Sequence, residues 1–343
     1  MRNIVILLLF VAVPHILAVC PGASKDTECF NDQTSCAEDS VLCEEDETIT
    51  ACFSCPVCHQ YLEAYGNCTE FPNLQCVPGY ECNKTDECTP IPGTCPEEME
   101  KSCVSLRPEC IGEQYAPRWC KGQKPTGRCF CVSKTGTRIF GENQWQKAEN
   151  MTCACSRRVE ALKEEQNRKD VTLHCTQEGN YEELQCDDGL CWCSDEKTGL
   201  PTSRILPESM MKMLYCYNET TVGSQYLRKC ESKEIARARI EMEMEYHGTL
   251  NPYFTFLKCD NDGTYSPVQL NGNQLQCVGK DNAALGSYAA MMSDITTMNC
   301  RCARDKQTYS NIDLICQSNG NYQATQYTND GAEYTVDEDG FNC

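Results

Sequence analysis

Residues 175–193 read Cys175-Thr-Gln-Glu-Gly-Asn-Tyr-Glu-Glu-Leu-Gln-Cys186, then Asp-Asp-Gly-Leu, then Cys191-Trp-Cys193. The runs on either side of Asp187–Leu190 have the pattern of two short strands, and Gly189 favours a tight turn between them. Because four cysteines lie in so short a stretch, the sequence indicates a small cross-linked unit rather than part of a large apolar core.

The same layout occurs three more times. One copy begins at Cys110 and reaches Cys129-Phe-Cys131-Val132, another runs from Cys259 to Cys277-Val278, and the last runs from Cys316 to Tyr334-Thr335. In all but the last copy a tail follows and ends in a cysteine 22 or 23 positions later, at Cys153, Cys216 and Cys300. At Cys153-Ala-Cys155 and Cys300-Arg-Cys302 one repeat closes as the next opens, so the chain is predicted to be an array.

The shared pattern of Cys, Asn/Gly-x-Tyr, Gln-Cys, Cys-Trp-Cys-Val, Gly and Cys resembles the thyroglobulin type-1 module, over roughly residues 95–343. Segment 155–216 matches it best. The resemblance implies modules at 95–153 and 155–216, a degenerate module at 230–300 and a truncated one at 302–343. The fold class we predict is small disulfide-rich α+β modules in tandem, preceded by a disulfide-rich irregular or β head at 19–94.

In that family the six cysteines pair first with second, third with fourth and fifth with sixth. The copy at 230–300 supports this order, because Leu270 and Leu275 replace the third and fourth cysteines together, as expected of a bonded pair. The implied disulfides are Cys120–Cys129, Cys131–Cys153, Cys155–Cys175, Cys186–Cys191, Cys193–Cys216, Cys230–Cys259, Cys277–Cys300 and Cys302–Cys316. Cys110 pairs with Cys95 or Cys103. The odd cysteine is then Cys343, which could link two chains in a dimer.

Two stretches have the composition of helices. Residues 156–169 open the second copy with Ser156 as the expected N-cap, and residues 231–246 of the third copy are rich in strong helix formers. Trp192 is expected to fill the core beside the disulfides of its module.

Composition limits both the fold and the partners. The chain has 343 residues, 31 of them cysteine, and a net charge of -20 from 50 acidic and 30 basic residues. Few apolar residues remain once cysteine and the first 18 residues are set aside, so several small cross-linked domains fit better than one large core. Nucleic acid and anionic membranes are poor partners because both require a basic surface.

The first residues predict secretion. Arg2 precedes the apolar run Ile4–Val13, which is too short to span a bilayer, and a small residue stands at the expected cut after Ala18. We therefore predict a signal peptide at 1–18 and a soluble, secreted, extracellular chain. The sequons at Asn67, Asn83, Asn150 and Asn218 predict N-glycosylation.

Residues 20–95 are cysteine-rich and poor in apolar residues. Cys52-x-x-Cys55-x-x-Cys58-His59 would suggest zinc in a cytosolic protein, but disulfides are the expectation in a secreted one. With Cys68, Cys76 and Cys82, this run resembles part of the amino-terminal module of insulin-like-growth-factor-binding proteins, although the Gly-Cys-Gly-Cys-Cys cluster of that family is absent. A generic cross-linked spacer is the alternative.

No catalytic motif is found, and the cysteines that could act as nucleophiles are explained by pairing. Beyond the first 18 residues the histidines are His59, His174 and His247. The acidic runs at 44–47, 260–263 and 337–340 lack the spacing of a calcium loop, so solvated surface is expected. We therefore predict no enzyme activity, no cofactor and no metal.

The family resemblance implies inhibition of papain-like cysteine proteases, since several such modules insert three disulfide-held loops into the protease cleft. Tied loops lose little entropy on binding, which favours this mode. The alternative is a non-inhibitory extracellular matrix or growth-factor-binding protein. The predicted protease-binding residues of the second copy are Lys169, Asp170, Val171, Thr172, Asp187, Asp188, Gly189, Leu190, Glu196, Lys197 and Thr198.

Overall fold

The computed structural model describes residues 17–18, 29–30, 47–52, 55–69, 75–124, 126–249, 257–309, 312–328 and 330–343, with side chains from residue 61 onward. The signal peptide predicted at 1–18 lies outside the described residues apart from Leu17 and Ala18. The side chains of the run from Cys52 to His59 also lie outside them. The chain forms two compact units, Met1–Pro96 and Glu97–Cys343.

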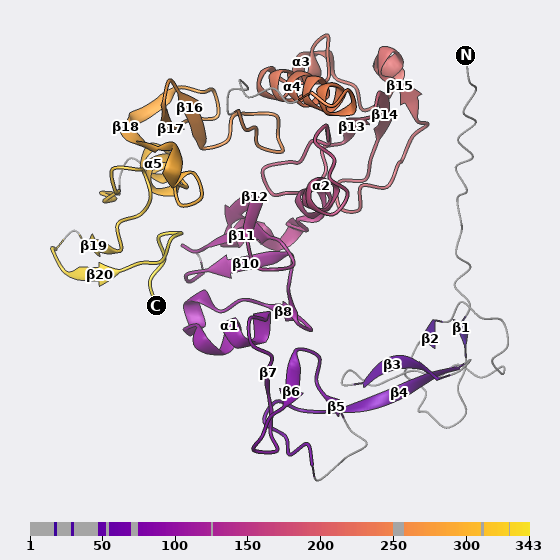
Figure 1. Ribbon diagram of the computed structural model, residues 1–343, viewed down its shortest axis with the longest axis vertical. Coiled ribbons are helices and arrows are strands. Elements are labelled where there is room, and N and C mark those ends of the chain that lie inside the picture. Colours follow the sequence, from indigo (N-terminus) through magenta and orange to yellow (C-terminus); the bar gives the residue numbers. More distant parts are fainter. Residues whose placement is uncertain are drawn as a thin grey trace. The chain divides into compact units, whose positions relative to one another are not determined.

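Short paired strands make up the described part of the first unit (Figure 1). These strands are β1 (Leu17–Ala18), β2 (Cys29–Phe30), β3 (Glu47–Cys52), β4 (Cys55–Leu62), β5 (Gln75–Cys76), β6 (Tyr80–Cys82) and β7 (Cys88–Pro90). Strands β3 and β4 are antiparallel, whereas β4 and β5 are parallel. The disulfides Cys68–Cys82 and Cys76–Cys88 tie the last strands together, so this part of the chain is disulfide-rich and β-structured.

The second unit repeats one arrangement, in which a helix precedes a β-hairpin. We refer to residues 95–153, 155–216, 230–300 and 302–343 as the first, second, third and fourth segments. The first contains α1 (Cys95–Lys101), η1 (Val104–Leu106), β8 (Cys110–Ile111), β9 (Gln114–Tyr115), β10 (Arg118–Lys121), β11 (Arg128–Val132), β12 (Arg138–Gln144) and η2 (Trp145–Asn150). The second contains α2 (Ala154–Glu164), β13 (Leu184–Asp187), β14 (Leu190–Cys193), β15 (Leu206–Pro207) and η3 (Glu208–Met213).

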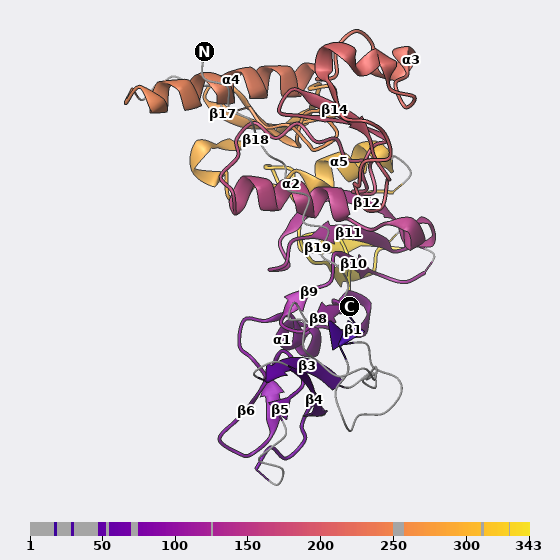
Figure 2. The ribbon, with the colours of Figure 1, turned by 90° about the vertical axis from the view of Figure 1, so that its right-hand side faces the viewer.

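The third segment follows a linker that holds α3 (Glu219–Val222). Its elements are α4 (Lys229–Tyr246), β16 (Val268–Asn271), β17 (Gln274–Val278), β18 (Ala284–Met291) and η4 (Met292–Asp294). The fourth contains α5 (Arg301–Thr308), β19 (Thr325–Tyr327) and β20 (Glu333–Thr335). Figure 2 shows α4 as a long helix that follows α3.

Each of the helices α2 and α5 packs against the sheet of the preceding segment. Helix α2 contacts β11 and β12, and α5 contacts β17 and β18 (Figure 1). The same arginine position joins each pair: Arg157 donates to the carbonyl oxygens of Val132 (2.8 Å) and Tyr115 (2.6 Å). Arg304 donates to those of Val278 (3.0 Å) and Tyr265 (2.6 Å). The two junctions are therefore built alike.

A buried glutamine recurs at one position of the second, third and fourth segments. The side-chain nitrogen of Gln185 donates to the carbonyl oxygen of His174 (2.7 Å), and its side-chain oxygen accepts from the backbone N–H of that residue (3.0 Å). Gln269 makes both bonds to Lys258, and Gln326 makes both to Ile315. Each glutamine thus ties its hairpin to the residue before a helix-linked cysteine, namely Cys175, Cys259 or Cys316.

All eight disulfides expected from the resemblance are present in the structure. The expectation for Cys343 is wrong, because Cys343 is bonded to Cys103. This bond also removes Cys103 as a partner of Cys110; Cys95 and Cys110 are both disulfide-bonded. Every cysteine from Cys68 onward is bonded, so the odd one in the total of 31 lies before residue 61.

The core of the second segment lies between α2 and the strands. Val159 and Leu162 of α2 pack with Val171, Leu173 and Tyr181, and Trp192 covers this cluster while partly buried, as expected. Ser156 is not the N-cap, because α2 begins at Ala154 and the hydroxyl of Ser156 has no capping bond. The carbonyl oxygen of Gly179 instead accepts from the backbone N–H groups of Cys155 (3.1 Å) and Ser156 (3.3 Å).

No helix among the residues that the structure describes is long and apolar enough to cross a bilayer.

Candidate functional site

The turn Asp187–Leu190 projects from the hairpin β13–β14 of the second segment. Asp188 and Gly189 both have positive φ, at 50° and 74°, which is the geometry of a two-residue hairpin turn. Asp188 and Gly189 are exposed, and 44% of Leu190 is exposed. The turn therefore presents Asp188, Gly189 and the apolar side chain of Leu190 to solvent.

The base of this turn is held rigidly. Cys186 and Cys191, the residues on either side of it, are disulfide-bonded. Arg168 forms two hydrogen bonds to the Asp187 carboxylate, at 2.6 and 3.1 Å. Thr172 donates its hydroxyl to the carbonyl oxygen of Cys186 (2.7 Å) and its backbone N–H to Asp187 (3.2 Å). Asp187 is thus a supporting residue of the turn rather than a free surface charge.

The first predicted loop, Asn167–His174, contains the predicted binding residues Lys169–Thr172; these lie beside the turn but offer few free atoms. Val171 and Thr172 are buried, and Val171 belongs to the core cluster. The Lys169 ammonium lies 2.7 Å from a carboxylate oxygen of Glu245 on α4, and Asp170 lies 3.3 Å from Arg168. This loop therefore supports the turn and contacts the third segment, and its central residues are not exposed as the prediction required.

The third predicted loop, Glu196–Thr198, lies at the other end of β14, so the structure does not bring it to the turn. A bridge between Ser194 and Pro201 closes it as a separate exposed turn. Within it the Asp195 carboxylate accepts from the backbone N–H groups of Lys197 (3.1 Å) and Thr198 (2.8 Å). The four residues of β14 separate the two turns by about 13 Å.

The segment that does lie beside Asp187–Leu190 is Leu206–Glu208, which the sequence analysis missed. Leu206 and Pro207 form β15 and pair with β14, and the backbone N–H of Glu208 donates to the carbonyl oxygen of Gly189 (2.9 Å). Ile205 next to it is exposed. The run of three apolar residues at 205–207 is the feature of the sequence that could have indicated this strand.

His174 is 3% exposed and lies between the second and third segments. Its Nε2 is 2.7 and 2.8 Å from the two carboxylate oxygens of Glu231 on α4, and its ring stacks on Tyr226 at 4.1 Å. Burial alone would lower the pKa of His174, but hydrogen bonds with Glu182 and Glu231 raise it above the ordinary value. The geometry joins the second and third segments through the contact of His174 with Glu231.

The predicted glycosylation sites lie at the surface. Asn67, Asn150 and Asn218 are exposed, and Asn83 is partly exposed. The side-chain oxygens of Asn67, Asn83 and Asn218 accept from the backbone N–H of the threonine two residues later, at 3.0, 2.8 and 2.9 Å. A glycan is attached through the side-chain nitrogen, which is not the atom used in these bonds.

The sulfur atoms of Cys68, Cys76 and Cys88 are the one group among the described side chains spaced for a metal ion, within 4.8 Å of one another. All three belong to disulfides, which removes the thiolates that a metal would need.

Residues 154–209, which carry the turn and its supports, match the family model of the thyroglobulin type-1 repeat. The chain contains a thyroglobulin type-1 repeat. Thyroglobulin from Rattus norvegicus is 26% identical to the chain over 133 residues, which is 38% of this chain and 4% of thyroglobulin. The chain thus aligns with a small part of that relative, and the matched repeat coincides with the second segment.

Proposed function

We propose that the chain is a secreted inhibitor of papain-like cysteine proteases and that it acts through the Asp187–Leu190 turn of its thyroglobulin type-1 repeat. The observation that carries the proposal is that this turn is exposed while both of its ends are fixed by the Cys186–Cys191 disulfide. The flanking strand Leu206–Pro207 extends the same edge.

Rigidity is the physical basis of the proposed inhibition. A turn whose conformation is set before binding loses little conformational entropy in the protease cleft. If the protease cuts between Asp187 and Leu190, the disulfide and the bonds from Arg168 and Thr172 keep both ends in place. The cut ends would then stay together and could be religated rather than released.

The first, third and fourth segments are part of the proposal as further repeats of the same family. The recurrent glutamine of the second, third and fourth segments and the matching arginines Arg157 and Arg304 support a tandem array. The many disulfides support an oxidising, extracellular location. The proposal assigns the chain no catalytic activity, cofactor, metal or nucleic acid partner. The insulin-like-growth-factor-binding resemblance of the head stays a prediction.

Inhibition assays with the full chain and papain or a cathepsin test the proposal. We expect inhibition at submicromolar concentration, weakened at least about tenfold by Leu190→Asp, because a charge would then enter the apolar part of the cleft. Met291→Asp is the matched control, since Met291 is an exposed apolar residue of the third segment, and it should leave inhibition unchanged.

Absence of inhibition by the correctly disulfide-bonded chain at micromolar concentration would reject the proposal. The alternative, a non-inhibitory extracellular matrix or growth-factor-binding protein, would then be favoured. Equal loss in Leu190→Asp and Met291→Asp would reject the assignment of the turn.

A further inference from the structure

Residues 337–341 form a compact acidic turn that is held by its own hydrogen bonds. The Asp337 carboxylate accepts from the backbone N–H groups of Asp339 (3.0 Å) and Phe341 (2.9 Å). The backbone N–H of Asp337 donates to the carbonyl oxygen of Phe341 (2.8 Å), and that of Gly340 donates to Asp337 (3.1 Å). These bonds within residues 337–341 define the shape of the turn.

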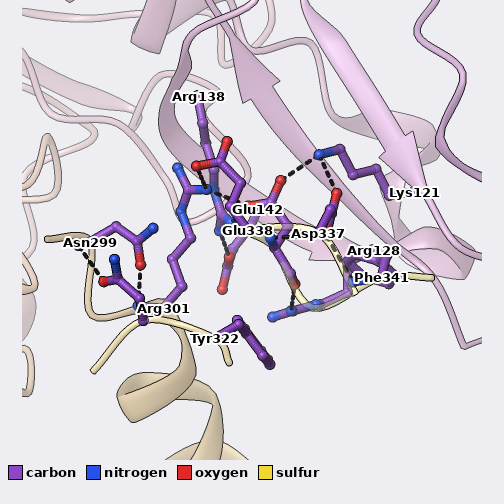
Figure 3. Close-up of polar contacts among 12 residues, drawn as sticks. Lys121, Arg128, Arg138, Glu142, Asn299, Arg301, Tyr322, Asp337, Glu338 and Phe341 are labelled. Atoms are coloured by element: carbon purple, nitrogen blue, oxygen red, sulfur yellow. Dashed lines mark hydrogen bonds and ion pairs between the residues drawn. The ribbon is translucent and has the colours of Figure 1, made fainter. Parts of the chain in front are cut away.

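Three cations of the first segment bind this turn (Figure 3). The Lys121 ammonium lies 2.8 Å from the Asp337 carboxylate and 2.6 Å from that of Asp339. Arg138 pairs with the other oxygen of Asp339 at 2.5 Å, and Arg128 donates to the backbone carbonyl of the same residue at 3.2 Å. Because hydrogen bonds between ionised groups are the strong ones, Asp339 is the centre of the contact.

An aromatic contact lies next to these ion pairs. The ring of Phe341 meets the edge of the Phe130 ring, with centroids 6.0 Å apart and planes at 67°. A Cβ atom at Gly122 would lie 2.9 Å from the Phe341 ring, so the turn fits closely against the start of the β10–β11 connection. Beyond it, the Ser105 hydroxyl donates to the carbonyl oxygen of Asn342 (3.0 Å), and Cys343 is bonded to Cys103.

The charges of the two surfaces are complementary. The chain as a whole carries a net charge of -20, yet this face of the β10–β12 sheet carries Lys121, Arg128 and Arg138 around Phe130. Arg128 also forms two hydrogen bonds of 2.7 Å with the Asp305 carboxylate, and Arg138 also pairs with Glu142. Lys121 pairs with Asp337 and Asp339 of the turn. Asp339 is 3% exposed and Lys121 is 7% exposed. Burial of such charges is tolerated only when each is paired, so the face is matched to an acidic ligand.

We infer that the face formed by Lys121, Arg128, Phe130 and Arg138 is a peptide-binding site for the acidic sequence Asp-x-Asp-Gly-Phe. In this chain the site is filled by the chain's own residues 337–341, and the Cys103–Cys343 disulfide keeps that ligand in place. When the tether is removed, a separate peptide of the same sequence can take its position.

The second segment provides a comparison, because it contains a similar turn that stays largely exposed. Its contacts include a hydrogen bond from Lys197 to the side chain of Asn150 (3.4 Å) and one from the backbone N–H of Tyr181 to Glu196 (2.8 Å). At 195–200 the backbone N–H of Asp195 donates to Leu200 (2.9 Å), that of Gly199 donates to Asp195 (2.8 Å), and residues 195–198 are exposed. The turn thus keeps its shape while residues 195–198 stay exposed. It has Lys197 where the docked turn has Asp339, so it lacks the carboxylate on which the site depends.

A full-length chain with Cys103→Ser, Cys343→Ser, Asp337→Asn and Asp339→Asn has a disabled tail and an open site. The probe is a fluorescent peptide of residues 334–343 with Cys343→Ser, and binding is measured by anisotropy. We expect saturable binding to one site, at least about tenfold weaker when the peptide carries Asp339→Asn or the chain carries Arg138→Gln. Raising the ionic strength from about 0.05 to about 0.5 M should also weaken it.

Two controls keep the result specific. A peptide of residues 194–203, which carries the exposed turn, should not bind, and the wild-type chain should not bind the test peptide because its site is filled. The inference is overturned if the open chain keeps its remaining disulfides and circular dichroism yet does not bind at about 100 μM. It is also overturned if the Asp339→Asn peptide binds equally well, or if the wild-type chain binds as strongly as the open one.

Discussion

Cys103 and Cys343 are bonded to each other across 240 positions of sequence. Ten other disulfides have both partners assigned among the described residues, and none of them spans more than 29 positions. The long bond fixes the end of the fourth segment to the first, so residues 103–343 form a covalently closed ring. In both views the C-terminal end lies beside the sheet that contains β10 and β11 (Figure 1, Figure 2).

Closure of this ring predicts that Cys343 does not join two chains. On non-reducing electrophoresis the wild type and Cys343→Ser should show the same oligomeric state, with the variant slightly slower because its ring is open. Cys343→Ser should also gain one thiol, that of Cys103, which a thiol reagent can count. A disulfide-linked dimer in the wild type that Cys343→Ser abolishes would contradict the closed ring.

Replacing Asp339 should weaken the contact between the fourth and first segments. Asp339 is buried and pairs with Lys121, Arg138 and Arg301, and Asp339→Asn leaves three cations with one anionic partner fewer. We expect a loss of about 3–5 kcal/mol in the free energy of unfolding, measured with urea at pH 7. Glu333→Gln, at an exposed site of the same segment, should change it by less than about 0.5 kcal/mol.

The same carboxylate predicts a loss of stability in acid. Burial would raise the pKa of Asp339, but Arg138, Arg301 and Lys121 lower it well below the ordinary range. Because the pKa is lower in the folded chain, the contribution is present in full above about pH 4 and is lost as the pH falls further. Urea unfolding of the wild type and Asp339→Asn should therefore converge below about pH 4; a constant difference down to pH 2 would exclude this origin.

The buried side chain of Gln185 should contribute more to the free energy of unfolding than its size suggests. It is 0% exposed, and its side chain satisfies the N–H and carbonyl of His174 and the carbonyl of Glu182. Gln185→Leu leaves these groups buried without partners, so we expect a loss of about 3 kcal/mol in thermal or urea unfolding. Gln166→Leu is the exposed control. Equal effects of the two changes would show that burial of the backbone groups is not the cause.

Local features of this fold could be predicted from the sequence because they depend on residues close together in the chain. The hairpin around Gly189 follows from a turn signal in the sequence, and the pairing of Cys186 with Cys191, five positions apart, is implied by the resemblance to the thyroglobulin type-1 module. Helix α4 (Lys229–Tyr246) begins two residues before the start that the sequence predicts, at 231. Such features are fixed by turn chemistry, helix propensity and short loops, which one sequence reports directly.

Contacts between segments could not be predicted in the same way. The acidic run at 337–340 has the composition of solvated surface, yet Asp339 is buried, because Lys121 and Arg138 of the first segment and Arg301 of α5 pair with it. Asp262 of the run at 260–263 is also buried; it pairs at 2.7 Å with Lys280, which lies in the same segment but 18 positions further along the chain. For the same reason the Lys169–Thr172 loop is partly covered, since α4 contacts it from another segment.

At the junction of the second and third segments, His174 predicts that stability falls as the pH rises, which is opposite in sign to the effect of Asp339. The pKa of His174 is raised by Glu182 and Glu231 against the effect of burial, while Arg228 nearby acts to lower it. Because the folded pKa lies above the ordinary value of about 6.5, the stabilisation is complete below that pH and is lost as the pH rises through the folded pKa. A neutral ring then leaves the Glu231 carboxylate buried without its cation.

We therefore expect the free energy of unfolding of the wild type to fall as the pH rises above about 6.5, by about 1.4 kcal/mol for each unit by which the pKa is raised. His174→Gln keeps a hydrogen-bond donor toward Glu231 but cannot titrate, so its stability should change little over this range. Urea unfolding of both chains at half-unit steps gives the comparison. Parallel pH profiles of the wild type and His174→Gln would mean that another group controls the junction, because only the wild type can lose a proton at this position.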